Sequence, residues 1–143
     1  MAAVSGELRS TILSGALTDP ASRWPAAAST RRSFPSARSD SRNYPGDIAG
    51  SPERALVYIA NRGHHTVSTF AISDGAPRFV GELDTGVSWP QHLLLAGDEL
   101  LVAGRESSNV AALSLHDGIP ASSRTLFGCP AAAWLLPGAA AGT

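Results

Sequence analysis

The stretch ALVYIANRG, residues 55–63, reads as a β-strand that ends in a tight turn. Its first six residues are rich in β-branched and aromatic side chains, which favour extended backbone, and Asn61 and Gly63 are typical of turns. Two further short runs follow, TVSTFAI at 66–72 and RFVGEL at 78–83. Side chains alternate in character along both runs, and turn-forming residues follow each. The region therefore predicts antiparallel strands joined by hairpins.

The same order of elements recurs 43 residues further along the chain, where DELLVAGRE at 98–106 aligns with ALVYIANRG. At this shift Arg62 meets Arg105, and other identities are kept: Ala60 with Ala103, Val67 with Val110, Asp74-Gly75 with Asp117-Gly118, and Pro77 with Pro120. A period in the low forties with four short strands per copy is typical of β-propeller blades, because helical repeats would show an apolar period of 3.6.

The repeat predicts an all-β fold, a partial β-propeller over residues 44–137. It would contain about two four-stranded antiparallel blades and one closing strand. The strands expected in the first blade are 46–50, 56–61, 67–73 and 79–84. Those expected in the second blade are 92–96, 99–104, 110–115 and 123–128. The closing strand is expected at 131–136, as the inner strand of a third blade, with Trp134 in the core.

Residues 1–43 differ in composition from the rest of the chain. Ser, Pro and Arg dominate residues 21–42, and no apolar period of 2 or 3.6 is sustained before residue 44. Such a segment buries too little surface to offset its ordering entropy, so we expect this third of the chain to be largely irregular. STILSGALT at 10–18 allows a strand pair. Residues 138–143 are expected to form a flexible tail.

The charge distribution argues against a nucleic-acid partner. The net charge of the 143 residues is −1, but residues 1–43 hold six arginines against three acidic residues, whereas residues 44–143 hold five against nine. An acidic body lacks the clustered cations that neutralise phosphates. We therefore expect no nucleic acid among the partners.

Other classes of site and location are disfavoured by missing patterns. The lone Cys129 forms neither an internal disulfide nor a thiolate cage, so no metal is expected. Phosphate-binding, dinucleotide-binding and nucleophile-elbow motifs are absent, so we expect no cofactor and no covalent serine mechanism. No apolar run is long enough for a membrane span. The cytoplasm is the expected location, and the Ser-, Ala- and Arg-rich stretch 24–42 leaves an organelle transit peptide as the alternative.

Several motifs together are similar to those of the lactonase family of seven-bladed β-propellers, which includes the propeller-type 6-phosphogluconolactonases. They are NYPGDI at 43–48, the Ser51-Pro52 turn, VYIANRGH at 57–64, WPQH at 89–92, LVAG at 101–104 and Cys129-Pro130. The resemblance covers residues 43–137 and corresponds to the last part of the family's propeller. It implies that this chain is a C-terminal piece of a longer lactonase. Gln91 departs from the family pattern, since members usually have arginine after this proline.

The meander order brings the candidate site residues to one rim, because the turn between the second and third strands and the blade-to-blade connection emerge at the same end. We expect Arg62, His64 and His92 to be catalytic there; the expected substrate-binding residues are Gln91, Arg105 and Glu106. Opening a lactone needs a base to activate water and a cation to hold the developing oxyanion. Either histidine would be the base, and Arg62 and Arg105 would hold the oxyanion or a phosphate.

The resemblance implies hydrolysis of a sugar-acid lactone such as 6-phosphogluconolactone, a step of carbohydrate metabolism in the pentose phosphate pathway. A muconate-type lactonising enzyme on the same scaffold is the second reading, and an inactive or binding-only fragment is the third. The expected partner is a small-molecule lactone. Because blades bury apolar faces against neighbours, open faces would also favour self-association. The plainer roles are a turn brace for Arg62 and a surface charge for Glu106.

Overall fold

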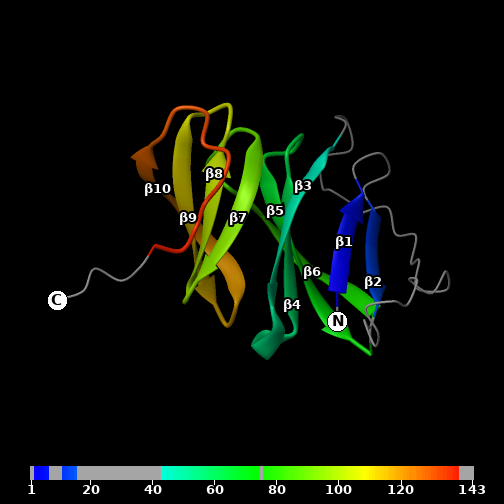
Figure 1. Cartoon of the computed structure of the whole chain (residues 1–143). Helices are drawn as coiled ribbons and strands as arrows, with labels where there is room; N and C mark the ends of the chain where they lie inside the picture. The colour runs from blue at the N-terminus through cyan, green and yellow to red at the C-terminus, as the bar shows by residue number, and fades with distance from the viewer. Residues whose placement is uncertain (1, 7–10, 16–42, 75, 139–143) are drawn as a thin grey trace.

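The computed structural model describes residues 2–6, 11–15, 43–74 and 76–138, and its elements there are β-strands and one short 3-10 turn, η2 (Pro52–Arg54) (Figure 1). The first four-stranded sheet has the order β3-β4-β5-β6 and consists of β3 (Pro45–Ser51), β4 (Leu56–Asn61), β5 (Thr66–Ser73) and β6 (Ala76–Asp84). The second has the order β10-β9-β8-β7 and consists of β7 (Pro90–Ala96), β8 (Glu99–Gly104), β9 (Asn109–His116) and β10 (Ile119–Gly128).

Both sheets are antiparallel meanders, so the all-β fold with two four-stranded blades is confirmed. All eight expected strands of the two blades are present. The largest difference in a strand start is in β10, which begins at Ile119 rather than at Ser123. Among the described residues, no helix has the length and apolar character to cross a membrane.

The two sheets stack face to face, with β3 beside β7 (Figure 1). Their shared core takes alternate residues from each strand, because successive side chains of a strand point to opposite faces. Its members in the two sheets are Leu56, Tyr58, Ala60 and Val67, and Leu93, Leu100, Val102, Ala111 and Leu113, with Val87 from the connection. Burying a large apolar side chain stabilises the fold by about 1.5–3 kcal/mol, so this shared core is the main force that holds the blades together.

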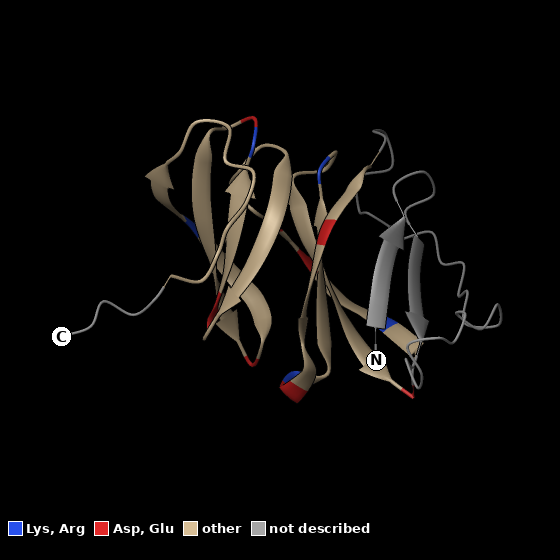
Figure 2. Ribbon diagram, in the orientation of Figure 1, with Lys and Arg blue, Asp and Glu red and all other residues tan. Residues whose placement is uncertain are grey.

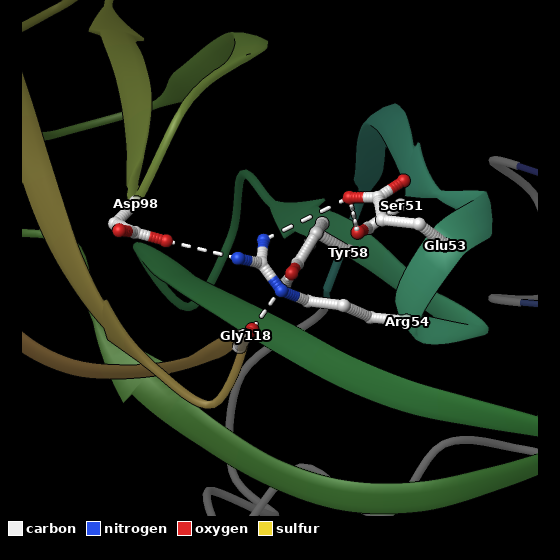
Figure 3. A network of polar contacts seen from close by, with 6 residues as sticks. All are labelled: Ser51, Glu53, Arg54, Tyr58, Asp98 and Gly118. Atoms are coloured by element: carbon white, nitrogen blue, oxygen red, sulfur yellow. Dashed lines mark hydrogen bonds and ion pairs between the residues drawn. The ribbon is translucent and has the colours of Figure 1, made fainter.

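A polar network also joins the two sheets where the β3–β4, β7–β8 and β9–β10 turns meet (Figure 3). Arg54 Nη2 lies 2.9 Å from Asp98 Oδ1, and the Tyr58 hydroxyl donates a buried hydrogen bond of 2.7 Å to the carbonyl oxygen of Gly118. Ser51 Oγ donates to Glu53 Oε1 at 2.5 Å. That hydrogen bond is the main reason why the pKa of Glu53 lies below its usual value, with Arg54 adding to the effect.

The inner strands of the two blades, β3 and β7, each carry a bulge near their start. The pairing register shifts between Pro45 and Ile48 in β3, and between Pro90 and His92 in β7. A bulge bends its strand and changes the direction of a side chain, and bulges are frequent beside functional sites. Here the bulges contain Asp47 in one sheet and Gln91 in the other. Charged residues lie mostly at strand ends and turns, with both signs present (Figure 2).

The expected closing strand is absent, which corrects the sequence prediction. Residues 131–136 run without strand pairing across the outer side of the second sheet, where Ala132 packs on Ala103 and Val110. A β-strand needs a neighbouring strand to accept and donate its backbone hydrogen bonds, and no strand within the described ranges pairs with this segment. Trp134, expected in the core, is 69% exposed.

The N-terminal third contains two described strands. The strands β1 (Ala2–Gly6) and β2 (Thr11–Gly15) form an antiparallel pair, and β1 lies beside β3 (Figure 1). The sequence allowed a strand pair at 10–18, whereas the observed pair joins residues 2–6 to 11–15. An isolated two-stranded hairpin is marginal in water, so its support comes from the neighbouring sheet, which the local sequence does not reveal. Residues 7–10, 16–42 and 139–143 lie outside the described residues.

Candidate active site

Three loops meet at one rim of the stacked sheets: the β4–β5 turn (62–65), the β6–β7 connection (85–89) and the β8–β9 turn (105–108). Trp89 joins all three. Its backbone N–H donates to His65 Nδ1 at 3.0 Å, and its carbonyl oxygen accepts the Arg105 N–H at 3.1 Å. Ser107 Oγ accepts the Ser88 N–H at 2.8 Å. The meander thus brings together the loops that carry Arg62, His64, Arg105 and Glu106, whereas Gln91 and His92 lie on β7, which follows the connection.

Trp89 adopts a left-handed backbone with φ +57°, which is unusual for a residue with a large side chain. Such a conformation costs about 1–3 kcal/mol and persists only where surrounding contacts hold it. The Arg62 guanidinium carbon lies 5.9 Å from the Trp89 ring centroid, and the Tyr44 ring centroid lies 5.9 Å from it. The rim therefore has a packed aromatic centre in the space between the two blades.

Arg62 is half-buried and contacts the first inner strand as well as Trp89. Its Nη2 donates to the Pro45 carbonyl oxygen at 3.2 Å, and its backbone N–H donates to the Tyr44 carbonyl oxygen at 2.9 Å. A planar guanidinium is suited to such simultaneous stacking and hydrogen bonding. These contacts show that Arg62 braces the rim by joining the β4–β5 turn to the start of β3 and to Trp89.

The two neighbouring histidines of the β4–β5 turn have different surroundings. His64 is buried, with 3% of its surface exposed. His65 has φ +60°, and its carbonyl oxygen accepts hydrogen bonds from the Thr85 N–H at 3.0 Å and the Thr85 hydroxyl at 2.7 Å. His65 therefore attaches the turn to the connection. The catalytic role predicted for His64 stays a prediction, at a side chain that solvent hardly reaches.

His92 lies on β7 and contacts two separate parts of the chain, β3 and residues 134–135. Its Nε2 is 3.5 Å from Asp47 Oδ2, and its Nδ1 accepts the Leu135 N–H at 3.1 Å. The Trp134 ring lies against it, with 3.9 Å between centroids and 31° between planes. Asp47 Oδ2 also accepts the Leu93 N–H at 2.8 Å, which fixes the carboxylate beside the imidazole. The imidazole of His92 therefore has the carboxylate partner that a general base needs for its orientation.

The predicted substrate-binding residues fall into two environments. Arg105 and Glu106 are exposed in the β8–β9 turn, so their charged ends face solvent. Gln91 is half-buried in the β7 bulge, and its Oε1 accepts no hydrogen bond from the described part of the protein. A cation open to solvent suits an incoming anion, whereas Gln91 offers an amide next to His92. Within the described ranges, no three His, Cys, Asp or Glu side chains come together as a metal site requires.

Two features of the site were not predicted from the sequence: the contact of Asp47 with His92, and the way Trp89 links the three loops. A signal for Asp47 was present, because the Tyr44-Pro45 and Trp89-Pro90 pairs align at a shift of 45, which places Asp47 opposite His92 in the repeat. Equivalent positions on adjacent inner strands are expected to be neighbours in a propeller. The left-handed backbone of Trp89 had no such signal, since this conformation is mostly adopted by glycine or asparagine.

Comparison with known proteins supports the fold and extends the match toward the N-terminus. The family model described as "Lactonase, 7-bladed beta-propeller" matches residues 2–130, so the match includes β1 and β2 as well as both blades. No curated protein matches the sequence.

Two solved structures are similar. One is a protein from Lactobacillus plantarum, with a TM-score of 0.72 and 18% identity; the match covers 90% of this chain and 39% of that one. The other is the periplasmic gluconolactonase of Pseudomonas aeruginosa, with a TM-score of 0.72 and 17% identity, covering 89% and 36%. The chain thus spans well under half the length of either structure. Since the family model covers most of its residues, this chain belongs to the lactonase family of seven-bladed β-propellers.

Proposed function

We propose that this chain contributes to the hydrolysis of a sugar-acid lactone, with 6-phosphogluconolactone as the first substrate to test. Membership of the lactonase family supports the reaction class, and one structural relative is named as a gluconolactonase. The observation that carries the proposal is the Asp47–His92 pair, at 3.5 Å between Oδ2 and Nε2. The imidazole with its carboxylate partner lies on β7, the inner strand that begins next to the rim that carries Arg62 and Arg105.

The proposed chemistry is the attack of water on the lactone carbonyl carbon. His92 would accept the proton of that water, and a rim arginine would hold the negative charge that develops on the carbonyl oxygen. The carbon–oxygen bond of the ring then breaks, and the ring oxygen leaves with the proton returned by the imidazolium. The product is the open-chain hydroxy acid, so atoms and charges balance.

Replacing the proposed base tests the reaction directly. We expect His92→Gln to lower the hydrolysis rate by about 10²–10⁴-fold, the usual contribution of a general base. The matched control is His116→Gln, because His116 lies exposed at the end of β9, away from the rim. The measurement is the initial rate of lactone loss above the buffer rate. Equal rates for His92→Gln and the unsubstituted chain would overturn the role of His92, and no rate above buffer would overturn the activity of this chain.

The exposed guanidinium of Arg105 suits the phosphate of a phosphorylated lactone. A charge-assisted hydrogen bond contributes about 1.5–3 kcal/mol, so Arg105→Ala should raise KM for 6-phosphogluconolactone by roughly 10–100-fold. We expect little change for unphosphorylated gluconolactone, which serves as the control substrate. A KM increase of equal size for both lactones would argue against phosphate recognition by Arg105.

A further inference from the structure

Two neighbours, the Leu135 N–H and the Asp47 carboxylate, hold His92 in one tautomer. The backbone N–H of Leu135 points at Nδ1, and an N–H donor requires a lone pair on the nitrogen that accepts it. Nδ1 is therefore the unprotonated nitrogen, and Nε2 carries the proton and faces Asp47 Oδ2. Nδ1 is consequently the nitrogen that could accept a proton from water, and it already accepts the hydrogen bond from Leu135.

In the segment that contacts His92, residues 129–138, Ala132 is the only buried residue, and Cys129 and Leu135 are partly buried against the same sheet. At its start, the Cys129 N–H donates to the Ser108 carbonyl oxygen at 2.9 Å and the Ala131 N–H donates to Ser108 Oγ at 3.3 Å. Further along, Ala132 is buried against the sheet. Toward its end, Trp134 and Leu135 contact His92, and the Trp134 side chain is otherwise exposed.

We propose that residues 129–138 form a strap that caps the basic nitrogen of His92, and that His92 reacts only after the Trp134–Leu135 end of the strap lifts. Asp47 acts as a positioning residue, because it holds the proton on Nε2 and leaves Nδ1 as the reactive atom. Segments with few buried contacts open locally without unfolding the rest of a protein. The proposal concerns the same histidine as the proposed function, but the reactivity of His92 is measurable without any lactone.

The test uses diethyl pyrocarbonate, which acylates unprotonated imidazole nitrogens, on the full chain, with each histidine followed by peptide mass spectrometry. In the unsubstituted chain we expect His92 to react far more slowly than His116, whose side chain is 85% exposed. Trp134→Ala removes the ring that covers His92, and we expect the His92 rate to rise by about tenfold, as the loss of one aromatic contact implies. Trp134→Phe should restore most of the protection.

Leu136→Ala is the matched control, since Leu136 is also an exposed apolar residue of the strap but lies beyond the two residues that contact His92. We expect this variant to leave the His92 rate unchanged relative to His116. An unchanged rate in Trp134→Ala, or an equal increase in Leu136→Ala, would overturn the strap. A rise in His92 reactivity without any lactone hydrolysis would leave the strap standing and count against the proposed function alone.

The positioning role of Asp47 has a separate readout in the ¹⁵N chemical shifts of the His92 ring. We expect the shifts of the unsubstituted chain to show the proton on Nε2, and those of Asp47→Asn to show a mixture of tautomers. The amide of that variant would still offer an oxygen to the Leu93 N–H, so the strand contact is kept. An Nδ1-protonated ring in the unsubstituted chain would contradict the proposal.

Discussion

Gly118 lies against the first blade, beside Leu56 and Arg54. It has φ +80°, and a β-carbon at this position would lie 2.6 Å from Leu56 Cδ1 and 2.7 Å from Arg54 Cδ. A side chain here would suffer both backbone strain and a clash across the blade interface. We therefore expect Gly118→Ala to lower the free energy of unfolding by about 2–4 kcal/mol, measured by urea denaturation.

Gly97→Ala separates the cost of backbone strain from the cost of the clash across the blade interface. Gly97 also has a positive φ, +61°, but a β-carbon there would meet no atom of the described residues within 4 Å. Its substitution should cost only the backbone strain, about 1 kcal/mol. Equal losses in the two variants would show that the contact of Gly118 with the first blade contributes nothing.

Tyr58 makes the stability of the blade interface depend on alkaline pH. Burial raises the pKa of its hydroxyl above the usual 10.0, because the phenolate is poorly solvated there. Above about pH 10 the Tyr58 hydroxyl loses its proton more easily in the unfolded chain than in the folded chain, which lowers the free energy of the unfolded state. The stabilisation from Tyr58 is therefore complete below about pH 10 and is lost as the pH rises through the pKa of the folded state.

Tyr58→Phe tests this dependence. At neutral pH it should lower the free energy of unfolding by about 1 kcal/mol, because the Gly118 carbonyl oxygen loses its donor. The difference from the unsubstituted chain should narrow when urea denaturation is repeated above about pH 10. A difference that stays constant with pH would mean that Tyr58 ionises equally easily in both states.

Strand β8 shows how alternation divides one element between two environments. Leu100 is fully buried in the core shared by the sheets, and Leu101 points to the other face and is partly exposed. Leu100→Ala should cost about 2–5 kcal/mol, the usual loss for a buried leucine. Leu101→Ala should cost at least about 1 kcal/mol less, because less surface returns to water. The same cost for both would contradict the register of this strand.

Strand positions were predictable because they depend on local pattern. The alternation in TVSTFAI and the turn-forming Asp74 and Gly118 identify hairpins without knowledge of distant contacts. The bulges at Asp47 and Gln91 were not predictable, since they arise from the pairing of two strands. Residues 131–136 were expected to form a strand because the repeat begins again at Cys129-Pro130, but they lack a partner strand within the described part of the chain, which the repeat does not reveal.

The two blades should unfold as one cooperative unit. Their core is continuous, with Leu56 and Tyr58 from the first sheet packed with Leu100 and Leu113 from the second. Leu100→Ala should therefore reduce the hydrogen-exchange protection of β4 amides as much as that of β8 amides. Loss of protection in the second sheet alone would show that the blades are independent.

The location of the site could be predicted from topology, whereas its contacts could not. Meander order is enough to bring Arg62, Arg105 and the connection before His92 to one rim. The partners of His92 come from β3 and from residues 134–135, far from it in sequence, and depend on how the blades stack. The burial of His64 likewise follows from the packed turn rather than from its neighbours in sequence.

Residues 45–128 form two consecutive propeller blades stacked face to face, and the site at the rim depends on this stacking. A nuclear Overhauser spectrum of the isotope-labelled chain would test it. Because Leu56 Cδ1 lies in the direction of an α-proton of Gly118, we expect a strong cross-peak between that methyl group and that proton. Cross-strand peaks within each sheet, such as Tyr58 with Thr69 and Leu101 with Ala112, would appear beside it. Their presence without any peak between the sheets would contradict the stacked blades.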